Sequence, residues 1–356
     1  MSNNTKLKII LLSIALSPLV SATEITTIIN KTTNNNNIIS TPTWYQLGGG
    51  SISNAISALT IDSNGNVYAG TYFNIYKTSN SGGIWEQFGG NFKSYVNLLL
   101  EYNNELYMGT ADNNIYTSSI NFADWQKFSN NEVAPVSAVD NNNVYAFSNQ
   151  HVYKTPINGQ SPWHALGGGI IPNNVNINTI TLDNNGNLYA GAAHNTEYAT
   201  NPGQGYVYKT LINGGPWQTL GGGIIPNNGV LSSIALDNNG NVYAAVVINQ
   251  ICYIYVASTS GSGSWQQFSA GQLPSGNMIT QLAIDANHGY IYVATGIYQI
   301  LNASYGGHIY KAPLTGGTWQ DLIGGAIPNT NIFSGLVLDS NGNVYAGNGS
   351  SVYEYK

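Results

Sequence analysis

The chain has 356 residues, of which only 7% are charged, and its formal net charge at pH 7 is -6. An ordinary soluble domain carries about 25% charged residues. All ten basic residues are lysines, and the absence of arginine together with the acidic balance argues against a nucleic-acid partner, which requires a basic surface.

The first 22 residues have the pattern of a secretory signal peptide. Lys6 and Lys8 precede a short apolar stretch, and small residues before position 23 predict cleavage after Ala22. The stretch is short for a membrane span, so an uncleaved anchor is the alternative, and no stable span is expected after cleavage. Residues 23–42 are polar and without period, which predicts a flexible Thr/Asn-rich tether. The mature protein is then expected to be secreted or periplasmic.

Residues 43–356 contain one unit that recurs seven times. Each copy has a tryptophan at the same place, namely Trp44, Trp85, Trp125, Trp163, Trp217, Trp265 and Trp319. An apolar stretch ending in an acid follows each tryptophan: Asp62, Glu101, Asp140, Asp183, Asp237, Asp285 and Asp339. A turn and two Tyr-centred segments complete the unit. Such regular repetition is typical of solenoids and propellers.

Each unit holds four short predicted strands, which we name a to d. In the first complete unit they are residues 58–62, 66–71, 75–79 and 85–89, each bounded by Gly, Asn or Pro. Four-stranded sheets arranged radially form a β-propeller, which leaves only short exposed edges. We therefore predict an all-β, seven-bladed β-propeller of four-stranded antiparallel blades. Because the region begins with a d strand at Trp44 and ends with a c strand, the N-terminal strand should complete the last blade and close a monomeric ring.

The seven repeated acids are predicted to be structural turn residues. Asp and Asn side chains bind backbone amides in turns, and glycine supplies a positive φ. A calcium loop would place its glycine at the sixth position, whereas Gly65 stands at the fourth from Asp62. The five histidines show no metal-ligand spacing, so no metal and no cofactor are expected, and no catalytic residue is nominated. Cys252, the single cysteine, lies in an apolar run and is predicted to be a buried, inert thiol.

The segment that joins strands c and d resembles a known family motif. Residues 78–85, TSNSGGIW, resemble the Asp-box (BNR) pattern of sialidase-like propellers, with Asn80 in the place of the aspartate. More degenerate copies precede Trp217 and Trp319. Segments such as DSNGNVYAG are also similar to the DxxGNxYV repeats of secreted bacterial propellers. The resemblance implies a secreted propeller in which the Asp-box is a turn motif away from the active face, and it transfers no activity.

A ligand site is predicted on the face that carries the b–c and d–a connections. Two of its b–c connections are long, residues 191–205 and 296–307, and extra length on a rigid scaffold is where function concentrates. The candidate ligand-binding residues in and beside them are His194, Glu197, Tyr198, Tyr298, Asn302, Tyr305 and His308.

The function predicted from these residues is an exported, non-enzymatic binding or interaction propeller that recognises a glycan or a protein. Tyr and Asn with little charge suit stacking and neutral hydrogen bonds. The alternative is a glycosidase or lyase of the Asp-box propeller type. It cannot be a sialidase, because arginine is absent, and the acids outside the turn series offer no evident catalytic pair. A surface protein that assembles through its tether is a third hypothesis.

Overall fold

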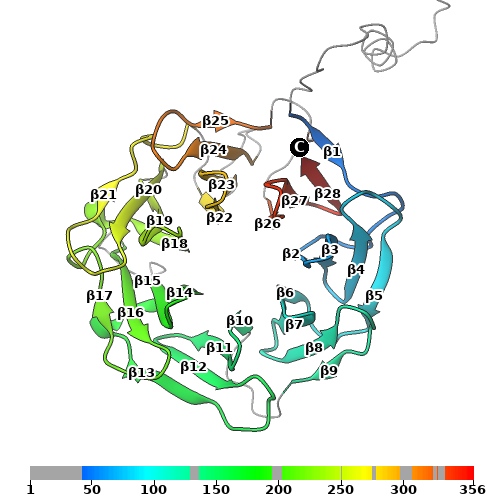
Figure 1. Ribbon diagram of the computed structural model, residues 1–356, viewed down its shortest axis with the longest axis horizontal. Coiled ribbons are helices and arrows are strands. Elements are labelled where there is room, and N and C mark those ends of the chain that lie inside the picture. The colour runs from blue at the N-terminus through cyan, green and yellow to red at the C-terminus, as the bar shows by residue number, and fades with distance from the viewer. Residues whose placement is uncertain are drawn as a thin grey trace, which may run out of the picture. The chain divides into compact units, whose positions relative to one another are not determined.

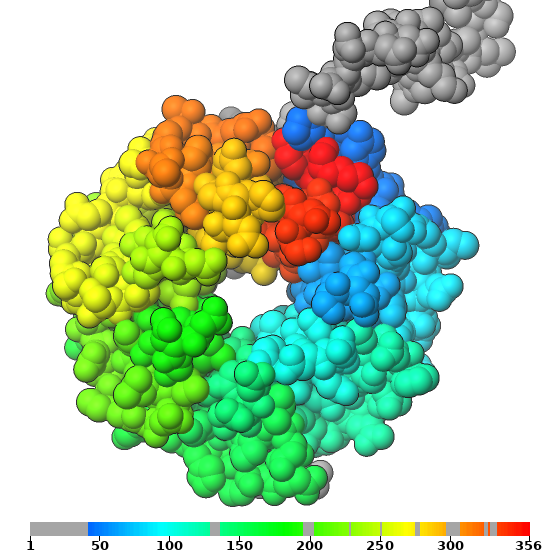
Figure 2. Space-filling model, viewed as in Figure 1, coloured from blue at the N-terminus to red at the C-terminus, as the bar shows by residue number. Residues whose placement is uncertain are grey.

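The computed structural model describes residues 42–128, 136–194, 203–249, 251–274, 278–296, 307–323, 327 and 333–356. These residues form seven four-stranded sheets arranged as blades around a common axis (Figure 1). In the space-filling view the ring is open at its centre (Figure 2). The predicted seven-bladed, all-β propeller is therefore confirmed. Within the described ranges, no helix has the length and apolar character that crossing a bilayer requires.

Each blade runs outward from strand a to strand d. Blade 1 holds β2 (Ala58–Ile61), β3 (Asn66–Gly70), β4 (Asn74–Ser79) and β5 (Glu86–Gly90). Blade 2 holds β6 (Val96–Tyr102), β7 (Glu105–Thr110), β8 (Ile115–Ser119) and β9 (Gln126–Lys127). Blade 3 holds β10 (Val136–Val139), β11 (Asn143–Ser148), β12 (His151–Pro156) and β13 (His164–Ile170). Blade 4 holds β14 (Asn176–Leu182), β15 (Asn187–Ala193), β16 (Gly205–Leu211) and β17 (Gln218–Thr219). Blade 5 holds β18 (Val230–Leu236), β19 (Asn241–Ile248), β20 (Ile251–Ser258) and β21 (Gln266–Gln267). Blade 6 holds β22 (Met278–Asp285), β23 (Tyr290–Gly296), β24 (Ile309–Pro313) and β25 (Gln320–Asp321). Blade 7 holds β26 (Gly335–Leu338), β27 (Val344–Asn348), β28 (Ser351–Tyr355) and β1 (Trp44–Gln46).

The two ends of the described region close the ring. Strand β1 pairs antiparallel with β28, with Trp44 opposite Tyr355 and Gln46 opposite Tyr353. The backbone N–H of Leu47 adds a 2.8 Å bond to the carbonyl of Val352. The expectation that an N-terminal d strand completes the last blade is therefore confirmed, and Figure 1 shows β1 beside β28.

The repeated aspartates hold the a–b turns. Asp62 Oδ1 accepts the backbone N–H groups of Asn64 at 2.9 Å and Asn66 at 2.8 Å, and its Oδ2 accepts the Tyr68 hydroxyl at 2.9 Å. Gly65 in this turn has φ +80, which only glycine adopts freely. The same bonds recur at Asp183, Asp237 and Asp339.

Three of the seven acids depart from this pattern. In blade 3, Asp140 accepts the backbone N–H groups of Asn142 and Asn143 and the Tyr145 hydroxyl, in a turn that is one residue shorter and has no glycine. In blade 2, Glu101 lies inside β6 and its Oε1 accepts the N–H of Asn104 at 2.8 Å. The turn is made by Asn103 and Asn104, both with positive φ, so no glycine is needed. In blade 6, Asp285 Oδ2 lies 2.8 Å from Nδ1 of His288.

The repeated tryptophans join neighbouring blades. Each of four rings donates its indole N–H to a backbone carbonyl in the outer strand region of the preceding blade: Trp44 to Leu322, Trp85 to Leu47, Trp125 to Phe88 and Trp319 to Gly271. The rings of Trp85, Trp125, Trp217 and Trp265 lie over glycines, and a Cβ built on Gly48 would come within 2.7 Å of the Trp85 nitrogen. The LGGG and FGG segments are therefore glycine-rich partly because a tryptophan packs on them.

Four of the ten lysines, Lys77, Lys154, Lys209 and Lys311, lie half-buried in strand c of their blades. Lys77 Nζ, in strand c of blade 1, donates to the carbonyl of Ile120 in blade 2 at 3.0 Å and lies 5.3 Å from the ring centroid of Tyr68. Lys209 Nζ makes the corresponding bond to Thr259 of the next blade at 2.9 Å. Burial lowers the pKa of Lys311, a further lysine in this position. These charges therefore serve blade-to-blade packing.

Cys252 lies buried in β20. Burial raises the pKa of its thiol to about 12. The thiolate fraction at neutral pH is therefore very small.

Candidate functional site

The propeller has two faces that differ in construction. On the first, which we call the turn face, c–d turns donate to a–b turns, as in Asn80 N–H to the carbonyl of Gly65 at 2.7 Å. On the second, which we call the loop face, d–a connections bind b–c connections, as in Ile171 N–H to the carbonyl of Gln150 at 3.0 Å. The loop face is the one on which the sequence predicts the ligand site.

Of the seven predicted ligand-binding residues, the structure describes His194 and His308. Glu197, Tyr198, Tyr298, Asn302 and Tyr305 lie outside the described residues. His194 directly follows β15 in blade 4, whereas His308 directly precedes β24 in blade 6. Blade 5 stands between them, so the two histidines belong to separate places on the loop face.

A hollow of about 840 Å³ opens on the outer rim of the loop face, which we call the rim hollow. Its lining residues come from blades 3 and 4: Pro172, Asn173, Tyr206, Trp217, Gln218, Thr219, Gly222, Gly223 and Ile224. Among these described lining residues there is no carboxylate, no amine and no histidine, so they offer a ligand neutral hydrogen-bonding groups and apolar surface. A site of that composition can bind, and it lacks the acid–base pair that hydrolysis or elimination needs.

The lining is positioned by the repeated loop LGGGIIPNN. The loop turns through η1 (Pro172–Asn174), where Asn173 has φ +69 and donates through Nδ2 to the Tyr208 hydroxyl at 2.9 Å. Tyr208 donates in turn to the carbonyl of Pro172 at 3.0 Å. Burial raises the pKa of Tyr208 to about 12, although the bond from Asn173 acts in the opposite direction. The second copy repeats this contact through η3 (Pro226–Asn228), with Asn227 donating to Tyr255 at 3.0 Å.

His194 lies next to the rim hollow. Its ring contacts Tyr206 edge-on, with centroids 6.5 Å apart, and Tyr206 stacks on Tyr208 at 5.8 Å. The Tyr206 hydroxyl is also hydrogen-bonded to Gln204 Oε1 at 2.9 Å. The predicted loop 191–205 therefore begins and ends beside this hollow.

His308 is paired with a carboxylate on the loop face. Its Nδ1 lies 2.7 Å from Asp321 Oδ2, and its ring stacks on Tyr310 at 5.5 Å. A carboxylate on Nδ1 orients the imidazole and fixes its tautomer. The sequence nominated His308 but missed Asp321, because the two meet only across the β24–β25 pair.

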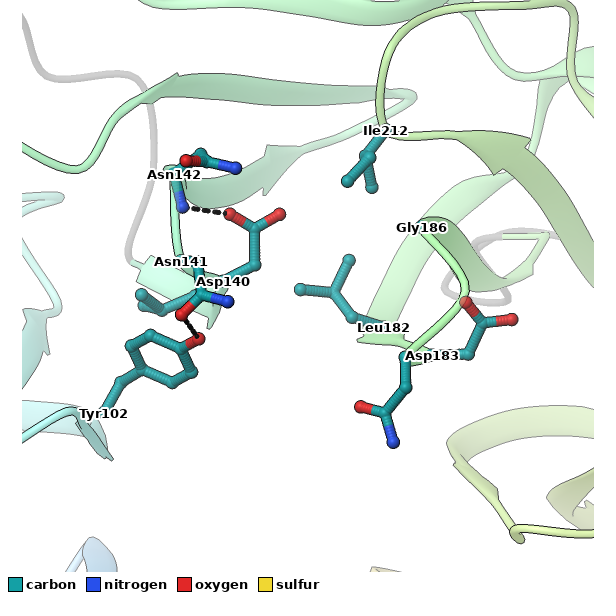
Figure 3. Close-up of a pocket in the computed structure, with 10 residues that line it drawn as sticks. Tyr102, Asp140, Asn141, Asn142, Leu182, Asp183, Gly186 and Ile212 are labelled. Carbon is teal, nitrogen blue, oxygen red and sulfur yellow. Dashed lines mark hydrogen bonds between the residues drawn. The ribbon is translucent and has the colours of Figure 1, made fainter.

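Two further hollows, of about 390 and 460 Å³, lie between neighbouring a–b turns of the turn face. In the first, Tyr102 of blade 2 donates to Asn141 at 2.7 Å, opposite Leu182 and Asp183 of blade 4 (Figure 3). The oxygens of Asp140 are occupied by Asn142, Asn143 and Tyr145. Within the described part of the chain, no group of three or more His, Cys, Asp or Glu side chains is placed to hold a metal ion.

Asp183, which lines both of these hollows, gives a testable pH dependence. Burial acts to raise the pKa of its carboxyl, but hydrogen bonds from Asn187, Tyr189 and Asn185 outweigh it and leave the pKa below the usual value. A carboxyl with a lowered folded-state pKa stabilises the fold above its unfolded pKa of about 3.9, and that contribution is lost as the pH falls through the folded pKa. We expect Asp183→Asn to reduce the free energy of unfolding at pH 7 by about 1–3 kcal/mol, because the oxygen that accepts the Tyr189 hydroxyl and the Asn187 side-chain amide is replaced by an NH2 donor.

The difference between Asp183→Asn and wild type should shrink at pH 3, as measured by urea denaturation. Asn184→Ala, which alters an exposed neighbour, is the control. An equal difference at both pH values would contradict the assigned role of the carboxylate.

Comparisons with known proteins identify the architecture only. No protein-family model matches the chain, and no curated protein sequence matches it. Among solved structures, the extracellular domain of the one-component system BT4673 from B. thetaiotaomicron aligns with a TM-score of 0.65 and 16% identity over 88% of this chain, which spans only 40% of that one. YCF48 bound to D1 peptide aligns with a TM-score of 0.62 and 14% identity over 90% of this chain and 98% of that one. Virginiamycin B lyase from Staphylococcus aureus, in a catalytically inactive form with quinupristin, aligns with a TM-score of 0.63 and 13% identity over 89% and 99%. Identities this low show a shared propeller fold, which serves binding proteins and lyases alike.

Proposed function

We propose that the chain is an exported, non-enzymatic binding propeller whose rim hollow holds an extended segment of a protein ligand. The observation that carries the proposal is a neutral hollow placed directly beside an uncovered strand edge. Of the two ligand classes expected from the sequence, glycan and protein, this arrangement favours a protein segment. The peptide-bound YCF48 neighbour supports the same choice.

The uncovered edge belongs to β17, the outermost strand of blade 4. Leu220 N–H bonds inward to the carbonyl of Val207 at 2.9 Å, and Thr219 pairs with Tyr208. Because backbone groups alternate in direction along an antiparallel strand, the N–H and C=O of Thr219 face away from β16. An added strand can pair there while its side chains enter the hollow against Tyr206, Trp217 and the exposed Ile224.

The test selects peptides from a phage-displayed random dodecapeptide library against the full chain. Selected peptides should bind at least about tenfold more weakly to Thr219→Pro, because proline removes the outward N–H. Thr219→Ala should bind normally. Gln267→Pro, which changes the matching position opposite Tyr255 on β21, is the matched control and should also leave binding unchanged. Absence of enrichment, or equal losses in both proline variants, would reject the rim hollow as the site.

The same experiment addresses the enzyme alternative. Bound peptides should be recovered with unaltered mass. A change of mass that depends on His308 would instead favour the lyase hypothesis, with the His308–Asp321 pair carrying the proton. The Asp-box likeness of residues 78–85 concerns a c–d turn on the turn face and supports neither activity.

Export rests on the signal-peptide pattern of residues 1–22, which lie outside the described residues. That the BT4673 neighbour is an extracellular domain supports the proposal.

A further inference from the structure

A cluster of three aromatic side chains lies on the loop face at the junction of blades 1 and 2, away from the rim hollow. Tyr72, Phe73 and Tyr95 are 48%, 47% and 47% exposed. The ring centroids of Tyr72 and Tyr95 are 5.6 Å apart, and those of Tyr72 and Phe73 are 6.1 Å apart. We call these three residues the aromatic platform.

Backbone bonds hold the platform in place. Tyr72 and Phe73 form the b–c connection between β3 and β4, and Tyr95 stands in the d–a connection just before β6. Phe92 N–H donates to the carbonyl of Phe73 at 3.2 Å, and Ala111 N–H donates to the carbonyl of Tyr95 at 3.0 Å. Val96 N–H bonds to the carbonyl of Thr71 at 3.1 Å and ties the two connections together. The rings are therefore presented by fixed backbone, which lowers the entropic cost of binding.

The platform departs from the repeat. The tryptophans and the strand-b tyrosines recur in the units because every blade needs them for packing. At the b–c connection, by contrast, blade 2 has Ala111–Asn113, blade 3 has Asn149–Gln150 and blade 7 has Gly349–Ser350. These blades fold without aromatic residues at this place, so Tyr72 and Phe73 are not required by the architecture. Half-exposed aromatic rings that the fold does not need indicate a binding surface.

The size and charge of the platform select the ligand. Three half-exposed rings offer on the order of 300 Å² of surface, well below the roughly 800 Å² per partner that a stable protein interface buries. An anionic membrane would require several basic residues, whereas the exposed charges beside the platform are one of each sign, Lys93 and Asp112. Neutral sugar rings match the charge and the small area of each tyrosine ring, and the 62° angle between the Tyr72 and Tyr95 rings means that each stacks with a separate sugar unit. The C–H face of a sugar stacks on an aromatic face while its hydroxyls remain in water.

We propose that the aromatic platform binds neutral pyranose units of a polysaccharide by stacking on Tyr72 and Tyr95. This site is independent of the rim hollow and of its protein ligand. The chain would then carry two sites on one face, one for a sugar and one for a polypeptide.

The test is electrophoresis of the full chain through native gels that contain hydroxyethyl cellulose, galactomannan or amylopectin. At least one polysaccharide should retard the wild type. Tyr72→Ala and Tyr95→Ala should each weaken that interaction by about tenfold, and Tyr72→Phe, which keeps the ring, should stay within about threefold of wild type. Thermal melting of each variant checks that it is folded.

Two matched variants make the outcome specific. Tyr45 on β1 is 49% exposed and stands apart from the platform, so Tyr45→Ala should migrate like wild type. Thr219→Pro should also migrate like wild type, which separates this site from the rim hollow. The proposal is overturned if no polysaccharide retards the chain, or if Tyr45→Ala weakens the retardation as much as Tyr95→Ala does. It is also overturned if Tyr72→Ala instead abolishes self-association or binding to phosphatidylcholine vesicles.

Discussion

We expect that a chain lacking residues 43–50 cannot be obtained as a soluble, folded monomer. The deletion removes β1 and leaves β28 as an unpaired edge strand in blade 7. It also removes Trp44 and Leu47, which are 6% and 3% exposed. Burying two such side chains contributes about 1.5–3 kcal/mol each, a large part of the 5–15 kcal/mol that stabilises a typical domain.

Size-exclusion chromatography with light scattering on the soluble fraction measures this outcome. We expect insoluble protein or assemblies joined through the free edge of β28. Deletion of residues 31–38, which removes the same length from the polar segment, should leave a folded monomer. A folded, monomeric protein without residues 43–50 would contradict closure of the ring by β1.

The blade count was predictable because the repeat is carried by residues with local reasons to recur. Asp62 and Gly65 form a turn that depends only on their own neighbours, and seven tryptophans mark the same step of the unit. What the tryptophans contact was not predictable. The acceptor of Trp85 is the carbonyl of Leu47, which directly follows β1 of the neighbouring blade 7.

The outer strands were the least predictable elements. The repeat predicted d strands of about five residues, whereas β9, β17, β21 and β25 each have two. Their side chains are exposed, so no core packing extends the pairing, and residue pattern alone does not report where the hydrogen bonds stop. The d strand of blade 3, β13, has seven residues, so the same sequence motif can also form a longer outer strand.

The predicted site can be compared with the rim hollow by position only. Long connections pointed to the loop face, and His194 does lie beside the rim hollow. The lining itself was missed, because Asn173 and Trp217 come from different blades and meet only through the rotation of one blade against the next. The aromatic platform did leave a signal in the sequence. Tyr72 and Phe73 stand where blades 2, 3 and 7 have small or polar residues, which departs from the repeat in a way that core residues do not.

The second large effect is expected for Trp85→Ala. Trp85 is 7% exposed and packs among Leu47, Ile56 and Tyr345, so it joins blade 1 to blade 7. Truncation of a buried aromatic residue to alanine costs about 3–5 kcal/mol, and we expect a loss of that size in the free energy of unfolding. Urea denaturation followed by tryptophan fluorescence and circular dichroism provides the measurement.

Two further substitutions separate packing from the indole hydrogen bond. Trp85→Phe keeps most of the apolar contact but loses the 2.9 Å bond to the Leu47 carbonyl, so its cost should be about 1–2 kcal/mol. Ile84→Ala changes the adjacent side chain, which is 71% exposed, and should stay within about 0.5 kcal/mol of wild type. If Trp85→Ala also fell within that range, the tryptophans could not be the contacts that hold neighbouring blades together. Their recurrence in every unit would then need another cause. We expect the free energy of unfolding to be highest for wild type, lower for Trp85→Phe and lowest by far for Trp85→Ala. This order follows only if the ring fills the space above Gly48 and its N–H donates to a carbonyl of the neighbouring blade.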